Sequence, residues 1–337
     1  MDLYERPENS EARLSSGSGT LPKQFIKDLS EGEALHSVFF LKKKELGTTK
    51  NGKPYLKLEF ADKSGTIEGR LWDDAELIDT RAMTGDAVVV KGSVDSWRGS
   101  LQMKVEDMFR AARGEYTESD LIRCVENRDE ILESVKTVLR KNVSNPWIIR
   151  LIKLFFADEE FISLLKKAPG ARSWHNAYIG GLLEHTCEVM VIVEKMTGLY
   201  PEMNRDIALL GAFLHDLGKM RELDPSTFEY TPSGGLIGHI AIGYELLSQK
   251  TDQIEGFPPD LAMHLKHIIL SHHGEYEQQS PVLPKTLEAI VVYHADNLVS
   301  QANAVREIMR SQGSKESSWS NFISIKNRKF FLERIET

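Results

Sequence analysis

The hydrophobic residues of this chain repeat with two different periods, and the change between them comes after Arg113. Before that point, segments such as Tyr55–Phe60 and Leu101–Phe109 alternate apolar and polar residues, the period of a β-strand with one buried face. After it, apolar residues recur at spacings of three and four, the period of an amphipathic helix. The chain is therefore expected to be a two-domain α+β protein, with strands first and helices after them.

The alternating part is long enough for a small barrel. Leu101, Met103 and Val105 are expected to point inward from one of its strands. Turns that carry Gly or Asn, where a positive φ is needed, lie at residues 50–53, 62–65 and 97–99. About five strands in this length suit a small closed β-barrel.

The rest of the chain reads as helices joined by loops rich in Pro, Gly and Ser. We expect helices over residues 118–143, 146–168, 182–200, 205–220, 239–251, 259–274 and 287–310.

Composition excludes several classes of protein. Hydrophobic residues make up 41% and charged residues 27% of the 337 residues, which is typical of globular proteins. No apolar run could cross a bilayer, so no membrane partner is expected. The first twenty residues lack the apolar core of a secretory signal and are expected to form a flexible tail. Cys124 and Cys187 form no CxxC pair, which argues against a disulfide framework or a zinc finger and fits a reducing cytoplasm.

The net charge of −8 is unevenly distributed along the chain. Residues 21–113 hold 16 Lys and Arg against 15 Asp and Glu, so the front part is near neutral and most of the acid lies behind it. The overall charge taken alone argues against a protein that neutralises phosphates, but this average hides the split, and the acid in the rear is compatible with binding metal ions.

Nine of the ten histidines follow residue 174, inside the helical part. Seven His and Asp residues stand in apolar helical stretches: His185, His215, Asp216, His239, His272, His273 and Asp296. Imidazoles and carboxylates on inward helix faces need a partner that repays their desolvation, and a divalent cation is such a partner. Since no thiolate joins them, the N/O ligand set favours Mn²⁺, Fe²⁺, Co²⁺, Mg²⁺ or Zn²⁺ in a near-octahedral site over a structural zinc cage.

A less specific interpretation applies to each residue alone, because a single His on an apolar helix face is more often a satisfied core residue than a ligand, and Asp296 alone could be a buried N-cap. Five or six of them together favour ligation. For His264 and His267 we expect a solvated or supporting role, and for His36 and His294 a structural or exposed one. Which of His272 and His273 ligates is left open.

These residues carry a resemblance. His185, then His215-Asp216, then Asp296 resemble the signature of the HD superfamily of metal-dependent phosphohydrolases, and His239 with His272 or His273 resembles its two-metal subset. The strings AYIGGLLEHT, LHDLGKMREL, EYTPSGGLIGHIAIG, LSHHGEYEQQSPVLPKTLEA and ADNL are similar to the YhaM-type 3′→5′ exoribonucleases. The resemblance covers residues 21–310.

The resemblance implies an N-terminal OB-fold β-barrel followed by an all-α HD-domain helical bundle. The implied division is a tail at 1–20, an OB-fold nucleic-acid-binding domain at 21–113, a helical connector at 114–165, an HD domain at 166–310 and a C-terminal extension at 311–337.

The resemblance also implies chemistry. Two divalent ions, with Mn²⁺ favoured, would activate a water and stabilise both oxygens of an in-line displacement, so that metal-bound hydroxide attacks the phosphodiester. Asp216 and Lys219 are the catalytic candidates. Lys219 is placed to neutralise a phosphate oxygen, although a helix-end charge near Gly218 is the simpler alternative.

The barrel is expected to hold single-stranded RNA, with single-stranded DNA as an alternative, by stacking bases on aromatic side chains within a basic groove. The candidates for these contacts are Tyr55, Lys57, Arg70, Trp72, Lys91, Trp97, Arg98 and Lys104. Each of them alone is more often a surface or core residue than a contact, and Trp72 has the further alternative of packing inside.

The expected activity is therefore metal-dependent 3′→5′ hydrolysis of single-stranded RNA to nucleoside 5′-monophosphates, with a homo-oligomer left open. One rival is an HD phosphohydrolase of free nucleotides or cyclic dinucleotides with a regulatory barrel. A second rival is a binding protein whose metal site only stabilises the fold.

Overall fold

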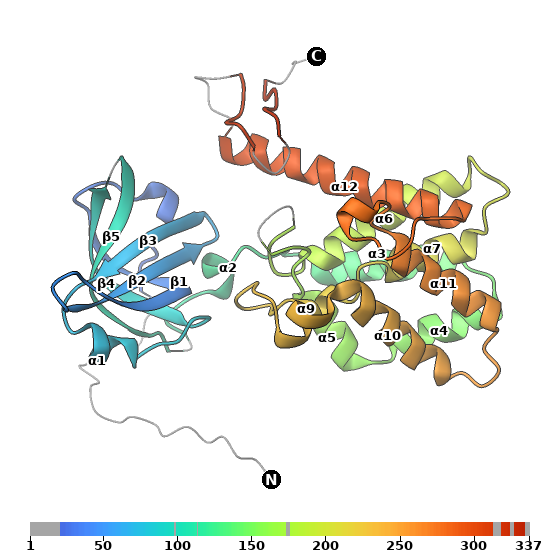
Figure 1. Cartoon of the computed structure of the whole chain (residues 1–337), viewed down its shortest axis with the longest axis horizontal. Coiled ribbons are helices and arrows are strands. Elements are labelled where there is room, and N and C mark those ends of the chain that lie inside the picture. Colours follow the sequence, from blue (N-terminus) through green and yellow to red (C-terminus); the bar gives the residue numbers. More distant parts are fainter. Residues whose placement is uncertain are drawn as a thin grey trace, which may run out of the picture. The chain divides into compact units, whose positions relative to one another are not determined.

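The change of hydrophobic period corresponds to a change of architecture in the computed structural model of the chain (Figure 1). The structure describes residues 21–97, 99–112, 114–172, 176–312, 318–323 and 327–333. The chain divides into two units at Arg123 and Cys124. The expected N-terminal tail, Arg98 and parts of the expected C-terminal extension lie outside the described residues. Within the described ranges, no helix has the length and apolar character that a membrane span requires.

The first unit is a five-stranded barrel. Its strands are β1 (Ala34–Thr48), β2 (Pro54–Asp62), β3 (Gly65–Leu71), β4 (Ala87–Trp97) and β5 (Ser100–Arg110). The short helices are η1 (Ile26–Asp28), α1 (Ala75–Asp79) and α2 (Glu118–Leu121). The strand order is β1-β2-β3-β5-β4, and β4 pairs with β1 to close the barrel. All pairs are antiparallel except β3 with β5.

The inward-facing side chains of the alternating strands fill the barrel. Leu56, Leu58 and Phe60 of β2 are almost fully buried, while the residues between them face outward. The predicted OB-fold barrel, followed by a helical domain, is confirmed.

One inward side chain was predicted wrongly. Met103 and Val105 are buried as expected, but Leu101 is 39% exposed. Leu101 pairs with Ser96 one step from the β4–β5 turn, at the end of the hairpin, and β5 pairs with β3 only from Gln102 onward. Alternation assigns a face to a residue but does not say where along the strand the core ends.

The second unit is helical. Its helices are α3 (Arg128–Asn142), α4 (Pro146–Phe156), α5 (Glu159–Lys167), α6 (Gly181–Thr197), α7 (Arg205–Leu214), α8 (Lys219–Glu222), α9 (Pro232–Ile237), α10 (His239–Asp252), α11 (Pro259–Ser271), η2 (Tyr276–Gln278) and α12 (Leu287–Gln312). Helix α6 packs against α3, α7 and α12, and α7 also contacts α11. Gly211 allows that last approach, since a Cβ there would lie 2.4 Å from Ile268 Cδ1. The C-terminal ends of α7 and α11 are thereby brought together.

Three stretches expected to be single helices are each divided in two: 118–143, 146–168 and 205–220. In the first, Val125 donates to Ile179 O at 3.0 Å and the backbone forms a bridge there. In the second, the Asp158 side chain accepts from Phe161 N at 2.9 Å and starts a new helix. The third is interrupted by the turn after Leu214, which carries the His-Asp pair.

Candidate functional site

The buried half of the site joins three helices of the second unit. His185 comes from α6, His215 and Asp216 follow α7, and Asp296 lies on α12. One ligand atom from each lies within 4.8 Å of all the others. His185 Nε2 is 3.1 Å from Asp296 Oδ1 and 3.3 Å from His215 Nε2. We call these four residues the buried cluster.

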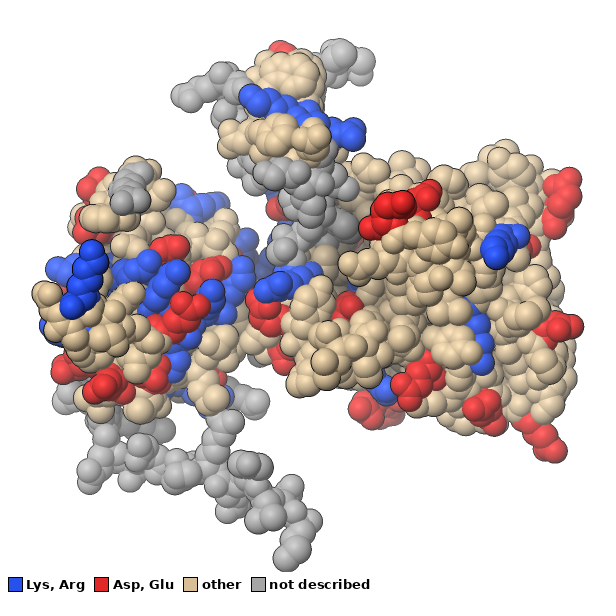
Figure 2. All heavy atoms as spheres, viewed as in Figure 1, with Lys and Arg blue, Asp and Glu red and all other residues tan. Residues whose placement is uncertain are grey.

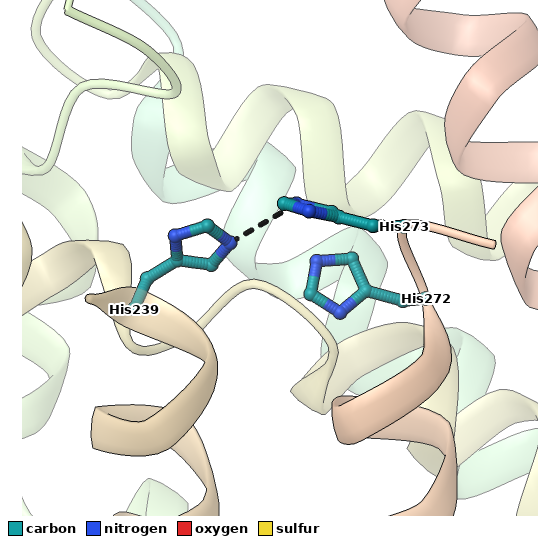
Figure 3. Close-up of side chains that lie close together, drawn as sticks. All are labelled: His239, His272 and His273. Atoms are coloured by element: carbon teal, nitrogen blue, oxygen red, sulfur yellow. Dashed lines mark hydrogen bonds between the residues drawn. The ribbon is translucent and has the colours of Figure 1, made fainter. Parts of the chain in front are cut away.

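The open half of the site consists of His239, His272 and His273, whose ligand atoms also lie within 4.8 Å of one another. Figure 3 shows His239 at the start of α10 facing the two histidines that follow α11. His239 Nε2 lies 3.3 Å from His273 Nε2. We call these three residues the open cluster, since His239 and His273 are only partly buried.

Asp216 lies between the two clusters. Its Oδ2 is 3.4 Å from His215 Nε2 and 3.6 Å from His185 Nε2. Its Oδ1 is 3.4 Å from His272 Nε2 and 3.6 Å from His239 Nε2. One carboxylate oxygen therefore faces each cluster, which is the arrangement that a bridging ligand of two cations requires.

The imidazole orientations fit metal ligands. Nδ1 of His215, His272 and His273 lies 2.7, 2.8 and 2.7 Å from the carbonyl oxygens of Ala212, Ile269 and Gln278. A carbonyl oxygen only accepts, so each Nδ1 carries the proton and donates, and each Nε2 of a neutral ring presents a lone pair to the centre. Such a partner on the other ring nitrogen is the usual companion of a metal-bound histidine.

Unpaired buried atoms give a second indication. Among the described residues, Asp216 Oδ1 and His272 Nε2 are buried without a hydrogen-bond partner. Buried polar atoms are nearly always satisfied, and a cation between the clusters would satisfy both. The donor set, imidazole nitrogen and carboxylate oxygen without thiolate, suits a divalent transition-metal ion.

The electrostatics keep Asp216, His272 and His273 in the protonation states that bind a cation. Burial alone would raise the pKa of Asp216, but Lys219 and His215 outweigh it and hold that pKa well below its usual value. Burial, reinforced by His272, lowers the pKa of His273 to about 4. Burial also lowers the pKa of His272, so the rings of His272 and His273 are neutral at pH 7.

Lys219 places a positive charge in contact with Asp216. Its Nζ donates to Asp216 Oδ2 at 2.7 Å, and its side chain is 16% exposed. Burial would lower its pKa, but Asp216 and Asp296 raise it, so the ammonium stays charged. A buried ammonium beside a candidate metal centre adds a fixed positive charge to it.

The other described histidines of the helical unit, His264, His267 and His294, belong to neither cluster. His267 Nε2 accepts from Lys285 N at 2.9 Å, which ties α11 to the segment before α12. The non-ligating roles expected for His264, His267 and His294 stay predictions.

Glu222 was missed by the sequence reasoning. It is 8% exposed, and its Oε1 accepts from both Nδ1 and the backbone N–H of His239, at 2.8 and 2.9 Å. Its sequence signal is weak: a glutamate in LGKMREL that stands between the exposed Arg221 and the buried Leu223. A charged residue at a buried helical position needs a partner, which is the signal that could have pointed to it.

The barrel places several of the residues predicted to bind nucleic acid in one row on its outer surface. Lys57 of β2 pairs with Arg70 of β3, and Arg70 pairs with Lys104 of β5. Tyr55 and Trp72 lie one step further on the same outer face and stack with ring centroids 5.0 Å apart. Trp72 is 42% exposed, so the alternative that it packs inside the barrel is wrong.

The other candidates of the barrel lie outside this row. Lys91 on β4 pairs with His36 and Asp107, and Trp97 stands at the end of β4 with 65% of its surface exposed. Arg98 lies outside the described residues. On the barrel face that Figure 2 shows, Lys and Arg are interspersed with Asp and Glu. Within the row itself, Arg70 forms an ion pair with Glu68 at 2.9 Å. The face is therefore mixed in charge.

Comparison with known proteins agrees with both halves of this description. Residues 182–300 match the family model of the HD domain, and residues 40–110 match an OB-fold nucleic acid binding domain. A 3′-5′ exoribonuclease YhaM of Listeria monocytogenes is 31% identical over 318 residues, covering 92% of this chain and 99% of the relative. The chain belongs to the YhaM exoribonuclease family. A YhaM of Bacillus velezensis is 33% identical over 270 residues, covering 79% of this chain and 85% of the relative.

Membership of the YhaM family makes the chain a hydrolase of the exonuclease class, as the sequence predicted. The HD match runs from Leu182 to Ser300 and includes every residue of both clusters, so the two clusters lie within the HD domain. The helical unit therefore contains the candidate active site, and the barrel is a nucleic-acid-binding fold.

Proposed function

We propose that this chain is a metal-dependent 3′→5′ exoribonuclease that removes nucleoside 5′-monophosphates from single-stranded RNA in the cytoplasm. The observation that supports this most strongly is Asp216, whose two carboxylate oxygens face two separate sets of imidazole Nε2 atoms. Single-stranded DNA is a second candidate substrate, and Mn²⁺ is the favoured ion. The two free cysteines fit a reducing compartment.

The residues divide into roles by position. His185, His215, Asp216 and Asp296 would hold one ion, and His239, His272, His273 and Asp216 a second. Divalent ions bound there supply Lewis acidity and a nucleophile made from water. Lys219 binds a non-bridging phosphate oxygen and stabilises the negative charge that develops on it.

The barrel grips the strand upstream of its 3′ end. The Tyr55–Trp72 stack offers an aromatic surface for a base, and Lys57, Arg70 and Lys104 offer charge for the phosphates. Because barrel and helical unit belong to one chain, a strand held by the barrel is present at high local concentration for the metal centre.

A digestion experiment tests the activity. RNA labelled at its 5′ end, with its 3′ end either free or blocked, is incubated with the full chain and Mn²⁺. We expect a ladder from the free 3′ end and none from the blocked end. Turnover of mononucleotides or cyclic dinucleotides without degradation of RNA would favour the rival phosphohydrolase instead.

A substitution separates cleavage from binding. Asp216→Ala should abolish cleavage while the protein still binds RNA through the barrel. Asp260→Ala changes an exposed aspartate at the start of α11 and serves as the matched control, with activity unchanged. Cleavage by a folded, metal-stripped Asp216→Ala protein would refute the assignment.

A second substitution tests the barrel. Trp72→Ala should weaken binding of single-stranded RNA by about 1–3 kcal/mol, the usual contribution of one stacked base. Leu77→Ala, at an exposed position on α1 of the same barrel, is the control. Equal affinity of the two variants for RNA would exclude the proposed stacking surface.

A further inference from the structure

His239 differs from three other histidines of the two clusters in how its ring is held. His215, His272 and His273 donate from Nδ1 to backbone carbonyls, whereas His239 donates to the Glu222 carboxylate. The same oxygen, Oε1, also accepts from the His239 backbone N–H. Gly238, which precedes His239, provides no side-chain cap for α10. One buried carboxylate thus fixes both the start of α10 and the ring of its first residue.

Glu222 lies behind the ring and not in the centre. Its Oε1 contacts Nδ1, while Nε2 on the opposite side of the ring points toward His273, as Figure 3 shows for these two rings. Two Nε2 lone pairs that face each other at 3.3 Å repel unless a proton or a cation lies between them. Glu222 therefore holds His239 in an arrangement that is favourable when a cation is bound.

The backbone around Glu222 is held independently of its carboxylate. Thr231 N donates to Glu222 O at 2.9 Å, and a Cβ on Gly234 would lie 2.0 Å from that same oxygen. A Cβ on Gly218 would lie 1.9 Å from His239 O. These close backbone contacts hold α8, α9 and α10 together, so loss of the carboxylate should release the His239 ring without separating the helices.

We propose that Glu222 is a positioning residue that sets the affinity of the open cluster for its divalent ion and leaves the buried cluster unaffected. The inference rests on the proposed function only in taking the open cluster as a cation site. A carboxylate on Nδ1–H both fixes the ring and makes Nε2 a more basic ligand. Among the histidines whose Nδ1 partner is described above, His239 is the one held by a side chain, so it is the one whose grip a substitution can change.

The test measures Mn²⁺ binding to the full chain by calorimetry and equilibrium dialysis. We expect the wild-type protein to bind two ions. Glu222→Ala should bind one of them about 10–100-fold more weakly, the usual effect of losing such a partner, and the other unchanged. Glu222→Gln should lie between, because its amide oxygen still accepts from Nδ1–H but carries no charge.

Glu288→Ala is the matched control. Glu288 is also 8% exposed, and its Oε1 accepts a backbone N–H, that of Asn204, at 2.7 Å. Its loss should lower the melting temperature without changing either Mn²⁺ affinity. Electron paramagnetic resonance gives a separate readout: wild-type protein with two equivalents of Mn²⁺ should show a spin-coupled pair, and Glu222→Ala the hyperfine pattern of an isolated ion.

Two outcomes would overturn the inference. Wild-type affinity for both ions in Glu222→Ala would show that the carboxylate does not set the open cluster. Equal weakening of both ions, matched by Glu288→Ala, would show a general loss of fold. Failure of the proposed function looks different, since the wild-type protein itself would then bind no Mn²⁺ or leave RNA intact.

Discussion

Replacing Gly274 by alanine would add a methyl group where the structure has no space for one. Gly274 follows His272 and His273 directly and has a φ of +78°. A Cβ there would lie 2.1 to 2.4 Å from three carbon atoms of the Tyr293 ring on α12. The left-handed conformation costs an alanine about 1–2 kcal/mol. Overpacking against the ring adds about 1–3 kcal/mol. The two costs together predict a loss of about 2–5 kcal/mol in the free energy of unfolding.

Urea denaturation of the metal-free protein measures this loss, and a double-mutant cycle separates its two parts. Tyr293→Ala removes the ring, so in that background Gly274→Ala should cost only the backbone strain, about 1–2 kcal/mol. The coupling between the two sites should therefore be about 1–3 kcal/mol. Additive effects within about 0.5 kcal/mol would refute the reasoning, because sites without contact behave that way.

Three further predictions follow from the site. Lys219→Met should lower kcat for RNA by a factor of about 10²–10³, as loss of a group that stabilises developing charge does, with a smaller change in KM. An unchanged kcat in steady-state assays would exclude this catalytic role and reduce Lys219 to the partner of Asp216 in an ion pair. In the metal-free protein, folded His273 stays neutral down to about pH 4, whereas the unfolded chain protonates it below its ordinary pKa of 6.5. The free energy of unfolding should therefore fall as pH decreases from about 6.5 to about 4, by up to about 1.4 kcal/mol per pH unit from this group. Urea titrations at several pH values measure this dependence, and His273→Gln should make it less steep. An equal dependence on pH in both proteins would contradict the prediction. Leu236, three residues before His239 in the chain, is 89% exposed, so Leu236→Ser should raise KM for RNA but not for bis(p-nitrophenyl) phosphate. Leu199→Ser, at a position 68% exposed, is the control and should change neither KM. Equal kinetics of the two variants on RNA would exclude contact between Leu236 and the substrate.

Much of the fold follows from residue patterns because those patterns are local. Alternation in β2 specifies which side chains fill the barrel, and the structure buries Leu56, Leu58 and Phe60 accordingly. Polar residues inside apolar helical stretches, such as His185 and Asp216, stand out for the same reason: the pattern shows that they are buried before it shows what they contact. The structure adds that they converge.

The parts that could not be predicted depend on contacts between distant segments. The parallel pairing of β3 with β5 cannot be predicted from the residue pattern of either strand. Helix α7 ends at Leu214, and the turn that follows it contains Gly218, whose close contact with His239 involves a residue twenty-one positions later in the chain. Glu222 resembles any helical glutamate until its partner is known, and His239 lies beyond a loop and the short helix α9.

Closure of the barrel limits how its surface can recognise a ligand. Each of the five strands pairs with a neighbour on both sides over at least part of its length, so the closed sheet offers no full-length free edge for an added strand. Recognition then falls to protruding side chains, which evolution can exchange one at a time without disturbing the framework beneath. Proteins that share this barrel can therefore differ in their affinity for a nucleic-acid strand and in the base sequence they prefer while keeping the same fold.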